Sequence, residues 1–299
     1  MTDNGPILEA HGLAKRYGRR TWALTGIDLA IPRGGITALV GPNAAGKSTL
    51  IKTWVGFERP TRGGVTVAGI DPWKDRAGAL GHLGYVPQSP SLYDALSVED
   101  HLELAVQLRP GFDRDSARQR LDELGIPRDR GARSLSGGQQ AQVALALALG
   151  TRAEILLLDE PLASLDPLAR REFLHVLTDA VRRDGATALL SSHIVTDVEQ
   201  ACDRLIVLGV GRVLLHATVA DALATHRIQR EGDEPVAGAT PVATFAGPAG
   251  ERLTLLRLGE AQPAAAAPDY PTTLEEVVLG YLASGRAVPG EVMPGTAAA

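Results

Sequence analysis

The sequence predicts an α/β fold in which a mostly parallel sheet is buried on both faces. Of two apolar runs, at residues 36–40 and 155–158, the second has the unbroken hydrophobicity of a strand that is covered on both sides. The first run leads through a glycine-bounded loop directly into a helix, and further strands and helices alternate along the chain. A chain of 299 residues with 44% hydrophobic content can bury one such core and still carry a smaller extension.

The loop after the first apolar run matches the pattern G-x-x-x-x-G-K-[ST] in full. It consists of Gly41, Pro42, Asn43, Ala44, Ala45, Gly46, Lys47, Ser48 and Thr49. Its glycines let backbone N–H groups face inward, and the next helix adds the positive end of its dipole, so the loop predicts a phosphate-binding site. Lys47 is expected to reach the β and γ phosphates, and the Ser48 hydroxyl to bind Mg²⁺. Many such loops have glycine at the position of Ala44, so a positive φ there is expected to cost about 1 kcal/mol.

Composition and charge narrow the possible functions. The formal net charge of −5 gives no overall electrostatic case for nucleic-acid binding, although local basic patches stay possible. The single cysteine, Cys202, excludes an internal disulfide and a cysteine-rich metal site, and we expect it to be a small apolar residue on a helix. The N-terminus lacks the pattern of a signal peptide, and no apolar run approaches the ~20 residues that span a bilayer. Any role at a membrane is therefore expected to be peripheral.

Polar residues follow three of the expected strands. Asp159 and Glu160 follow the run at 155–158, Gln88 follows a strand at 83–86, and His193 follows a strand at 187–191. Open α/β sheets bind their ligands at the carboxyl ends of the strands. Asp159 is placed to hold Mg²⁺ opposite Ser48, and Glu160 to polarise an attacking water. Structural roles also stay open: Asp159 and Glu160 as an acidic turn, Gln88 as a solvent-exposed loop residue, and His193 as a hydrogen-bonded histidine without a catalytic role.

A second anion site is suggested by Ser136, Gly137, Gly138 and Gln139, which precede a helix at residues 140–149. A Ser-Gly-Gly turn that opens a helix presents unpaired backbone N–H groups and a hydroxyl. An ordinary N-cap by Ser136 is the simpler alternative.

Asp166 and Tyr17 each allow two interpretations. Asp166 precedes Pro167, which predicts an N-cap and the start of the next helix, so a structural role is available to it. Tyr17 is expected in a polar turn at residues 15–18. Its ring there is either partly buried in the loop or free to lie flat on a base.

Six motifs occur along the chain in the order GPNAAGKST, YVPQ, LSGGQ, ILLLDEP, SLD and SSH. Over about residues 7–224 the chain therefore resembles the ATP-binding subunit of an ABC transporter. LSGGQ shortly before a strand that ends in Asp-Glu separates this family from kinases, GTPases and helicases. The resemblance implies a P-loop NTPase core at residues 1–225, with an N-terminal antiparallel β subdomain and a helical subdomain at about residues 89–150. Residues 226–299 are expected to form a C-terminal extension.

The resemblance also implies how the two anion sites work together. In the family, two subunits pair head to tail and bury each ATP between the phosphate loop of one and the LSGGQ motif of the other. ATP and Mg²⁺ are therefore the expected cofactors. The resemblance implies that Tyr17 stacks on adenine, and that Ser48, Gln88 and Asp159 bind the metal ion. It implies that Glu160 acts as the catalytic base, with His193 and Gln88 as further catalytic residues. It also implies that Asp166 links the two sites, and that the partner chain contributes the contacts from Ser136, Gly137, Gly138 and Gln139.

Two kinds of partner follow from the resemblance: a second ABC ATPase subunit, identical or a close paralogue, and integral membrane permease subunits. The expected location is the cytoplasm, peripheral to the inner face of the cell membrane, and no nucleic-acid partner is expected. Residues 89–99 and the C-terminal tail resemble the export-type subgroup, so export is expected. A non-transport ABC-family ATPase and a nucleotide-gated regulatory module stay open as alternatives. The sequence departs from many family members at Gln142 and Leu147, where arginines are common.

The C-terminal extension is expected to contain two short strands, at residues 242–245 and 252–258, and a helix at about residues 273–284. One apolar face of that helix consists of Leu274, Val277, Val278, Tyr281 and Leu282. This face is expected to pack on the protein's own core, with a dimer contact as the alternative. The remaining expectations are linkers at residues 235–239 and 261–268 and disorder at residues 287–299.

Overall fold

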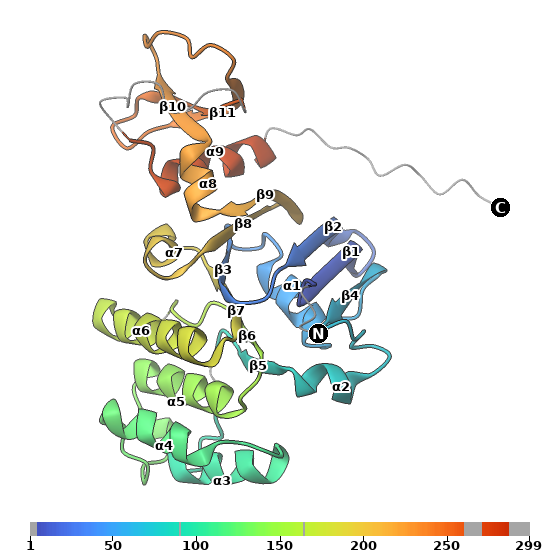
Figure 1. Cartoon of the computed structure of the whole chain (residues 1–299), viewed down its shortest axis with the longest axis vertical. Coiled ribbons are helices and arrows are strands. Elements are labelled where there is room, and N and C mark those ends of the chain that lie inside the picture. Colours follow the sequence, from blue (N-terminus) through green and yellow to red (C-terminus); the bar gives the residue numbers. More distant parts are fainter. Residues whose placement is uncertain (1–4, 90, 164, 260–270, 287–299) are drawn as a thin grey trace, which may run out of the picture.

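The core of the molecule is a six-stranded sheet with the strand order β5-β6-β7-β3-β8-β9 (Figure 1). The strands are β3 (Gly35–Val40), β5 (Leu83–Val86), β6 (Ile155–Leu158), β7 (Thr187–Ser192), β8 (Arg204–Gly209) and β9 (Arg212–Thr218). All neighbours pair in parallel except β8 and β9, which are antiparallel. This computed structural model describes residues 5–89, 91–163, 165–259 and 271–286, and it confirms the predicted α/β class.

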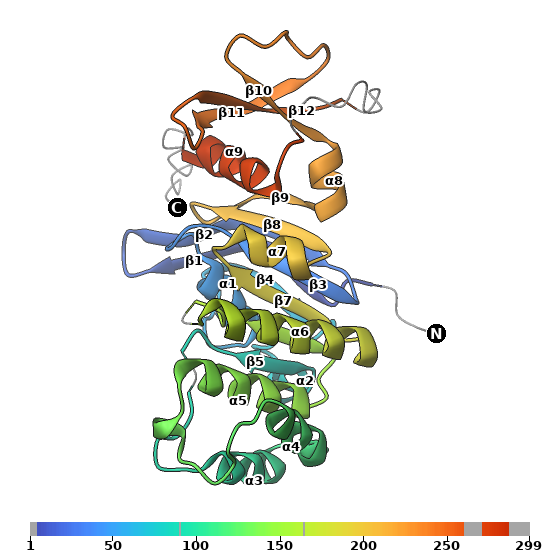
Figure 2. The same ribbon diagram turned by 90° about the vertical axis from the view of Figure 1, so that its left-hand side faces the viewer.

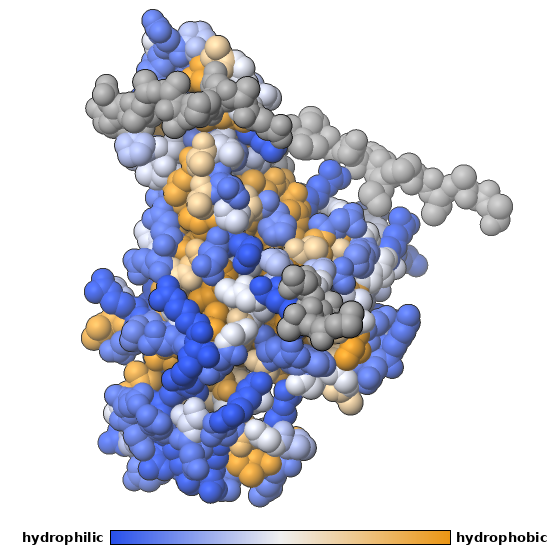
Figure 3. Space-filling model, viewed as in Figure 1, coloured by the Kyte–Doolittle hydropathy of each residue, from blue (hydrophilic) through white to orange (hydrophobic). Residues whose placement is uncertain are grey.

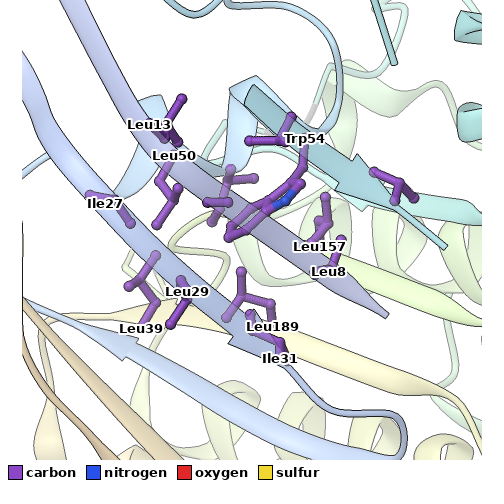
Figure 4. Packing of buried hydrophobic residues seen from close by; sticks show 14 of the residues in the cluster. Leu8, Leu13, Ile27, Leu29, Ile31, Leu39, Leu50, Trp54, Leu157 and Leu189 are labelled. Carbon is purple, nitrogen blue, oxygen red and sulfur yellow. The ribbon is translucent and has the colours of Figure 1, made fainter. Parts of the chain in front are cut away.

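One face of this sheet packs against a helix and a second, antiparallel sheet. The helix is α1 (Lys47–Trp54), and the second sheet has the order β2-β1-β4, with β1 at Leu8–Tyr17, β2 at Thr21–Ile31 and β4 at Arg62–Val67. Trp54 is fully buried in this layer, and its indole Nε1 donates a hydrogen bond to Glu9 O at 2.9 Å (Figure 4). Alternate residues of the six-stranded sheet, including Leu39, Leu157 and Leu189, line the same face.

The opposite face of the sheet is covered by helices (Figure 2). They include α5 (Gly137–Gly150), α6 (Pro167–Asp184) and α7 (Val195–Ala201). Leu156, Leu158 and Leu190 point to this side and pack with α5 and α6. Because β6 and β7 are covered on both sides, every position in them is buried, which explains the continuous apolar run of β6 in the sequence. Cys202 packs beside these residues, and burial raises the pKa of its thiol to about 12.

Three helices form an apolar cluster of their own beside the sheet. They are α3 (Val98–Leu108), α4 (Arg114–Glu123) and α5, and their buried residues are Val98, Leu102, Ala117, Leu121, Val143 and Ala146. The helix α3 begins with a capping box. Ser97 Oγ accepts from Asp100 N at 3.0 Å, and Asp100 Oδ2 accepts from Ser97 N at 2.9 Å. A short helix before β5, α2 (Arg76–Gly81), was not identified in the sequence.

The prediction that Tyr17 lies in a polar turn at residues 15–18 is wrong, because β1 continues through these residues. Tyr17 is the last residue of β1 and pairs with Thr21 of β2. The pairing of β1 shifts between Ala10 and Leu13, where Gly12 has a φ of 53°. Such irregularities break the two-residue period of a strand, so the hydrophobic pattern stops early in the sequence.

The C-terminal elements are α8 (Val219–Ala224), β10 (His226–Arg230), β11 (Thr240–Ala246), β12 (Arg252–Arg257) and α9 (Leu274–Arg286). The three strands form an antiparallel sheet in the order β10-β12-β11, and α9 lies between it and the six-stranded sheet (Figure 2). Leu274 and Val278 are buried with Leu205 of β8, so the apolar face of α9 packs on the chain's own core. The sequence analysis missed β10, and the expected linker at 261–268 and tail at 287–299 lie outside the described residues.

Among the described residues, no helix has the length and hydrophobicity needed to cross a bilayer. On the face seen in Figure 3, hydrophilic surface alternates with separate apolar patches.

A buried histidine joins the C-terminal sheet to α9. His226 Nδ1 lies 2.8 Å from Ala222 O, and its Nε2 lies 2.9 Å from the Tyr281 hydroxyl. Because a carbonyl oxygen can only accept, Nδ1 carries the proton and Tyr281 donates to Nε2. Burial lowers the pKa of His226, and Arg257 on the paired strand acts in the same direction.

We expect the free energy of unfolding to decrease as the pH falls below 6.5, the ordinary pKa of histidine. The unfolded chain then binds a proton that folded His226 excludes, so stability rises with pH in this window, by at most about 1.4 kcal/mol per pH unit for one group. Denaturant unfolding between about pH 5.5 and 7.5 measures the slope. His226→Gln should reduce the slope but not abolish it, because burial also lowers the pKa of His216. His175→Gln, at an exposed position, is the control; one common slope in all three proteins would contradict the assignment.

Candidate functional site

A cavity of about 420 Å³ lies between β2 and the loop that connects β3 to α1. The residues that line it are Thr21, Trp22, Ala23, Asn43, Ala44, Ala45, Gly46, Lys47, Ser48, Thr49, Gln88 and Glu160. The loop, Gln88 and Glu160 meet because β3, β5 and β6 are parallel and all end at the same edge of the sheet. The structure thus brings most of the expected phosphate-binding loop together with two expected catalytic residues.

Two glycines of the loop are required by close backbone contacts. A Cβ added to Gly41 would lie 2.2 Å from Leu208 O, and one added to Gly46 would lie 2.6 Å from Ala23 O. Gly46 also has a φ of 106° and forms the N-cap of α1. The loop is therefore fixed between β2 and β8, with the start of α1 facing the cavity, as a phosphate-binding helix start requires.

Ala44 adopts the left-handed conformation, with a φ of 65°. Ala44→Gly is therefore expected to increase the free energy of unfolding by roughly 0.5–1 kcal/mol, because the relief of steric strain exceeds the added freedom of the unfolded chain. Ala45→Gly is the matched control, since Ala45 is buried and has no positive φ, and it should be destabilising. Denaturant unfolding of both variants tests this; destabilisation by Ala44→Gly would show that the loop carries no strain.

The ammonium group of Lys47 is held inside the loop. Its Nζ lies 2.8 Å from Glu160 Oε1 and donates to Gly41 O at 2.7 Å and Pro42 O at 3.1 Å. The side chains of Lys47 and Glu160 are 3% and 8% exposed, so this is a buried ion pair. Each charge depends on the other for compensation, and an anionic phosphate that enters the loop competes with Glu160 for the ammonium.

A buried carboxylate lies directly beneath the loop. Asp159 Oδ1 accepts hydrogen bonds from Ser48 Oγ at 2.9 Å and from Ser191 Oγ at 3.2 Å. Burial raises the pKa of Asp159, and the two hydroxyls oppose that shift only in part. A cation beside Asp159 would stabilise its charged form. The available ligands are hydroxyl, carboxylate and, from Gln88, amide oxygens, which is the donor set that Mg²⁺ prefers, so these residues fit that ion.

The backbone places Glu160 and His193 close together. Glu160 has a φ of 47°, and its backbone N donates to Ser191 Oγ at 2.7 Å. His193 Nδ1 lies 3.2 Å from Glu160 Oε2. Lys47, Glu160 and His193 therefore form one connected group, of which Lys47 and Glu160 line the cavity.

The second expected anion site is not part of this cavity. Ser136 caps α5, and it forms a capping box with Gln139, whose N donates to Ser136 Oγ at 3.2 Å. Ser136, Gly137, Gly138 and Gln139 do not line the cavity. Asp166 is the N-cap of α6, and its Oδ1 accepts from Leu168 N and Ala169 N, both at 3.0 Å. The structural roles predicted for Ser136 and Asp166 are thus present.

Two aromatic residues lie near the mouth of the cavity. The Tyr17 hydroxyl is 3.5 Å from Thr49 Oγ1, but its ring, with Lys15 Nζ 5.0 Å from the centroid, does not line the cavity. Trp22 does line it, and the guanidinium carbons of Arg16 and Arg62 lie 5.3 and 5.8 Å from its ring. The sequence analysis missed Trp22. An aromatic residue just across a turn from Tyr17 was the available signal.

The two departures from the family pattern lie in apolar surroundings. Gln142 is 4% exposed, and neither polar atom of its amide has a hydrogen-bond partner among the described residues. Leu147 packs against the cluster formed by α3, α4 and α5.

Comparison with known proteins identifies the same family. Residues 24–163 match the family model described as ABC transporter. The chain is 35% identical to the methionine import ATP-binding protein MetN of Streptomyces avermitilis, over 73% of this chain and 68% of that one. It is 30% identical to the lipopolysaccharide export system ATP-binding protein LptB of Haemophilus influenzae, over 75% and 95%. Thiamine and sulfate/thiosulfate import ATP-binding proteins also match.

Solved structures agree with these relatives. An ATP-binding subunit of an ABC transporter superposes with a TM-score of 0.66 and 30% identity, over 72% of this chain and 91% of that chain. A dimeric ATP-binding cassette bound to ADP and Pi gives a TM-score of 0.65 and 25% identity, over 71% and 99%. The expectation of export is not supported, because most of the named relatives are import proteins. The chain belongs to the ABC transporter family, among its ATP-binding subunits.

Proposed function

We propose that this chain hydrolyses ATP as a subunit of an ABC transporter, and that two copies, or one copy and a close paralogue, enclose each ATP. The observation that carries this proposal is the joining of the phosphate loop to the acidic end of β6 by Lys47–Glu160 and Ser48–Asp159. A site with a phosphate-binding lysine, a buried carboxylate and a candidate base has the parts that phosphoryl transfer needs.

The catalytic steps assigned to this chain are binding and proton transfer. Lys47 and the backbone N–H groups of the loop bind the β and γ phosphates, and Tyr17 and Trp22 flank the adenine ring of ATP. Ser48, Asp159 and Gln88 would hold Mg²⁺, which would neutralise charge on the phosphates. Glu160 accepts a proton from the attacking water as the water oxygen bonds to the γ-phosphorus, and the bond from that phosphorus to the β–γ bridging oxygen breaks, so that ADP and inorganic phosphate leave.

Closure by a second chain accounts for the residues outside the cavity. Ser136, Gly137, Gly138 and Gln139 are proposed to contact the γ-phosphate bound by the partner chain, and His193 to contact the γ-phosphate bound by its own. Gly138 lies against α6, since a Cβ added to it would be 3.3 Å from Ala169 Cβ, so this turn is next to the start of the helix that Asp166 caps. ATP favours the closed dimer because only that state offers it both sets of donors.

A membrane-spanning permease is the proposed partner, and this chain is proposed to bind it from the cytoplasmic side of the membrane. An open groove of about 580 Å³ runs between the sheet and α3, and the residues lining it include Phe57, Tyr85, Tyr93, Leu104, Leu108 and Leu147. Pro87 also lines the groove, and the next residue, Gln88, lines the nucleotide cavity. A permease segment bound in the groove would therefore lie one residue away from the nucleotide site. Tyr93 and Leu108 are 63% and 73% exposed, as expected of residues that a partner covers.

The test combines hydrolysis with localisation. The purified chain should release phosphate from ATP, sediment as a dimer with ATP, and sediment with membranes only when a multi-span permease encoded beside it is co-expressed. Cosedimentation with ribosomes or DNA instead would favour an ABC-family ATPase without a transport role. Binding without turnover would favour a nucleotide-gated regulatory module, an alternative that the position of Glu160 argues against.

A further inference from the structure

A single serine on β7 touches both acidic residues of the site. Ser191 is fully buried; its Oγ accepts from Glu160 N at 2.7 Å and donates to Asp159 Oδ1 at 3.2 Å. We propose that Ser191 is a positioning residue for ATP hydrolysis, which holds Glu160 and Asp159 in their working orientations. This inference rests on the proposed ATPase function.

The hydrogen-bonding capacity of a hydroxyl makes the two contacts compatible. Ser191 has one proton to donate, which goes to the carboxylate of Asp159, and it uses a lone pair to accept from Glu160 N. Asp159 cannot donate when ionised, and a backbone N–H cannot accept, so both directions are fixed. The hydroxyl therefore links the metal-binding carboxylate to the backbone of the proposed base.

Glu160 needs such a restraint because its backbone is strained. Its φ of 47° lies in the left-handed region, which a residue with a side chain rarely adopts unless its surroundings hold it there. Glu160 is 7% exposed, so without Ser191 Oγ its backbone N–H would have no water to bind. A shift of this backbone would move the carboxylate away from Lys47 Nζ and His193 Nδ1, at present 2.8 and 3.2 Å away.

Ser192 provides a matched control one position along the same strand. It is also buried, at 4% exposure, but successive side chains of a strand point to opposite faces. Its Oγ accepts from Ile194 N at 3.0 Å and lies 3.5 Å from Asp197 Oδ2. Loss of the Ser192 hydroxyl therefore removes a buried polar contact without touching Glu160 or Asp159.

The experiment compares Ser191→Ala, Ser191→Cys and Ser192→Ala with the wild-type chain in steady-state ATP hydrolysis. Ser191→Ala is expected to lower kcat by about 10–100-fold and to raise the Mg²⁺ concentration for half-maximal rate several-fold, as loss of an outer hydrogen bond to a metal ligand does. The Kd for ATP measured without Mg²⁺ should change less than about threefold, because the phosphate loop is untouched. Ser191→Cys replaces the hydroxyl with a larger thiol that forms weaker hydrogen bonds, so it should be intermediate.

Several outcomes would overturn the inference. These are equal kcat values for Ser191→Ala and Ser192→Ala, or a loss of ATP affinity as large as the loss of kcat. If Ser191→Ala does not fold, Ser191→Cys decides, and wild-type kcat in that variant overturns the role. Absence of hydrolysis by the wild-type chain would instead refute the proposed function itself.

Discussion

Glu160→Gln is expected to lower ATP hydrolysis by about 10²–10⁴-fold, the usual contribution of one general base. An amide cannot accept the proton of the attacking water, whereas its shape and its contacts within the site are nearly those of the carboxylate. ATP binding should persist or strengthen, because Lys47, now 2.8 Å from Glu160 Oε1, would no longer be neutralised by that carboxylate. The variant should therefore accumulate as an ATP-bound dimer.

Phosphate release and sedimentation velocity with ATP measure the two consequences separately. Glu172→Gln is the control, since Glu172 is an exposed glutamate on α6 whose replacement removes the same charge from the surface. Unchanged turnover in Glu160→Gln would overturn the assignment of the base. Slow turnover without a dimer would support the assignment of Glu160 as the base but refute the arrangement of two chains around ATP.

Lys47→Met is expected to destabilise the protein by about 3–5 kcal/mol even without nucleotide, because it leaves the buried Glu160 carboxylate without its cation. This expectation differs from simple loss of phosphate binding, which would not alter the unfolding of the nucleotide-free chain. The basis is burial, since the side chains of the pair are 3% and 8% exposed. The double variant Lys47→Met/Glu160→Gln should recover most of the loss, because a neutral amide needs no counter-ion.

Denaturant unfolding of the four proteins in this cycle provides the measurement. Lys74→Met is the control, because Lys74 is 85% exposed and 3.8 Å from Asp71, and it should change stability by less than about 0.5 kcal/mol. Additive effects of the two single substitutions would show that Lys47 and Glu160 do not depend on each other.

The sequence by itself determined the α/β class, the phosphate loop and the acidic end of β6. These features are local: an unbroken apolar run reports burial on both faces, and a glycine pattern reports a tight loop before a helix. The meeting of Ser48 with Asp159 was predictable as well, because parallel strands end at one edge of their sheet.

Only the tertiary structure decided which of these residues touch. Ser191 appears in the sequence as the polar end of an apolar strand, and its bonds to Asp159 and Glu160 depend on β7 lying beside β6, more than 30 residues away. Because β1 pairs with β2, Trp22 lines the cavity and Tyr17 lies in a strand rather than in a turn. Such contacts depend on strand order and register, which no short stretch of sequence encodes, because their energy comes from segments that meet only after the chain has folded.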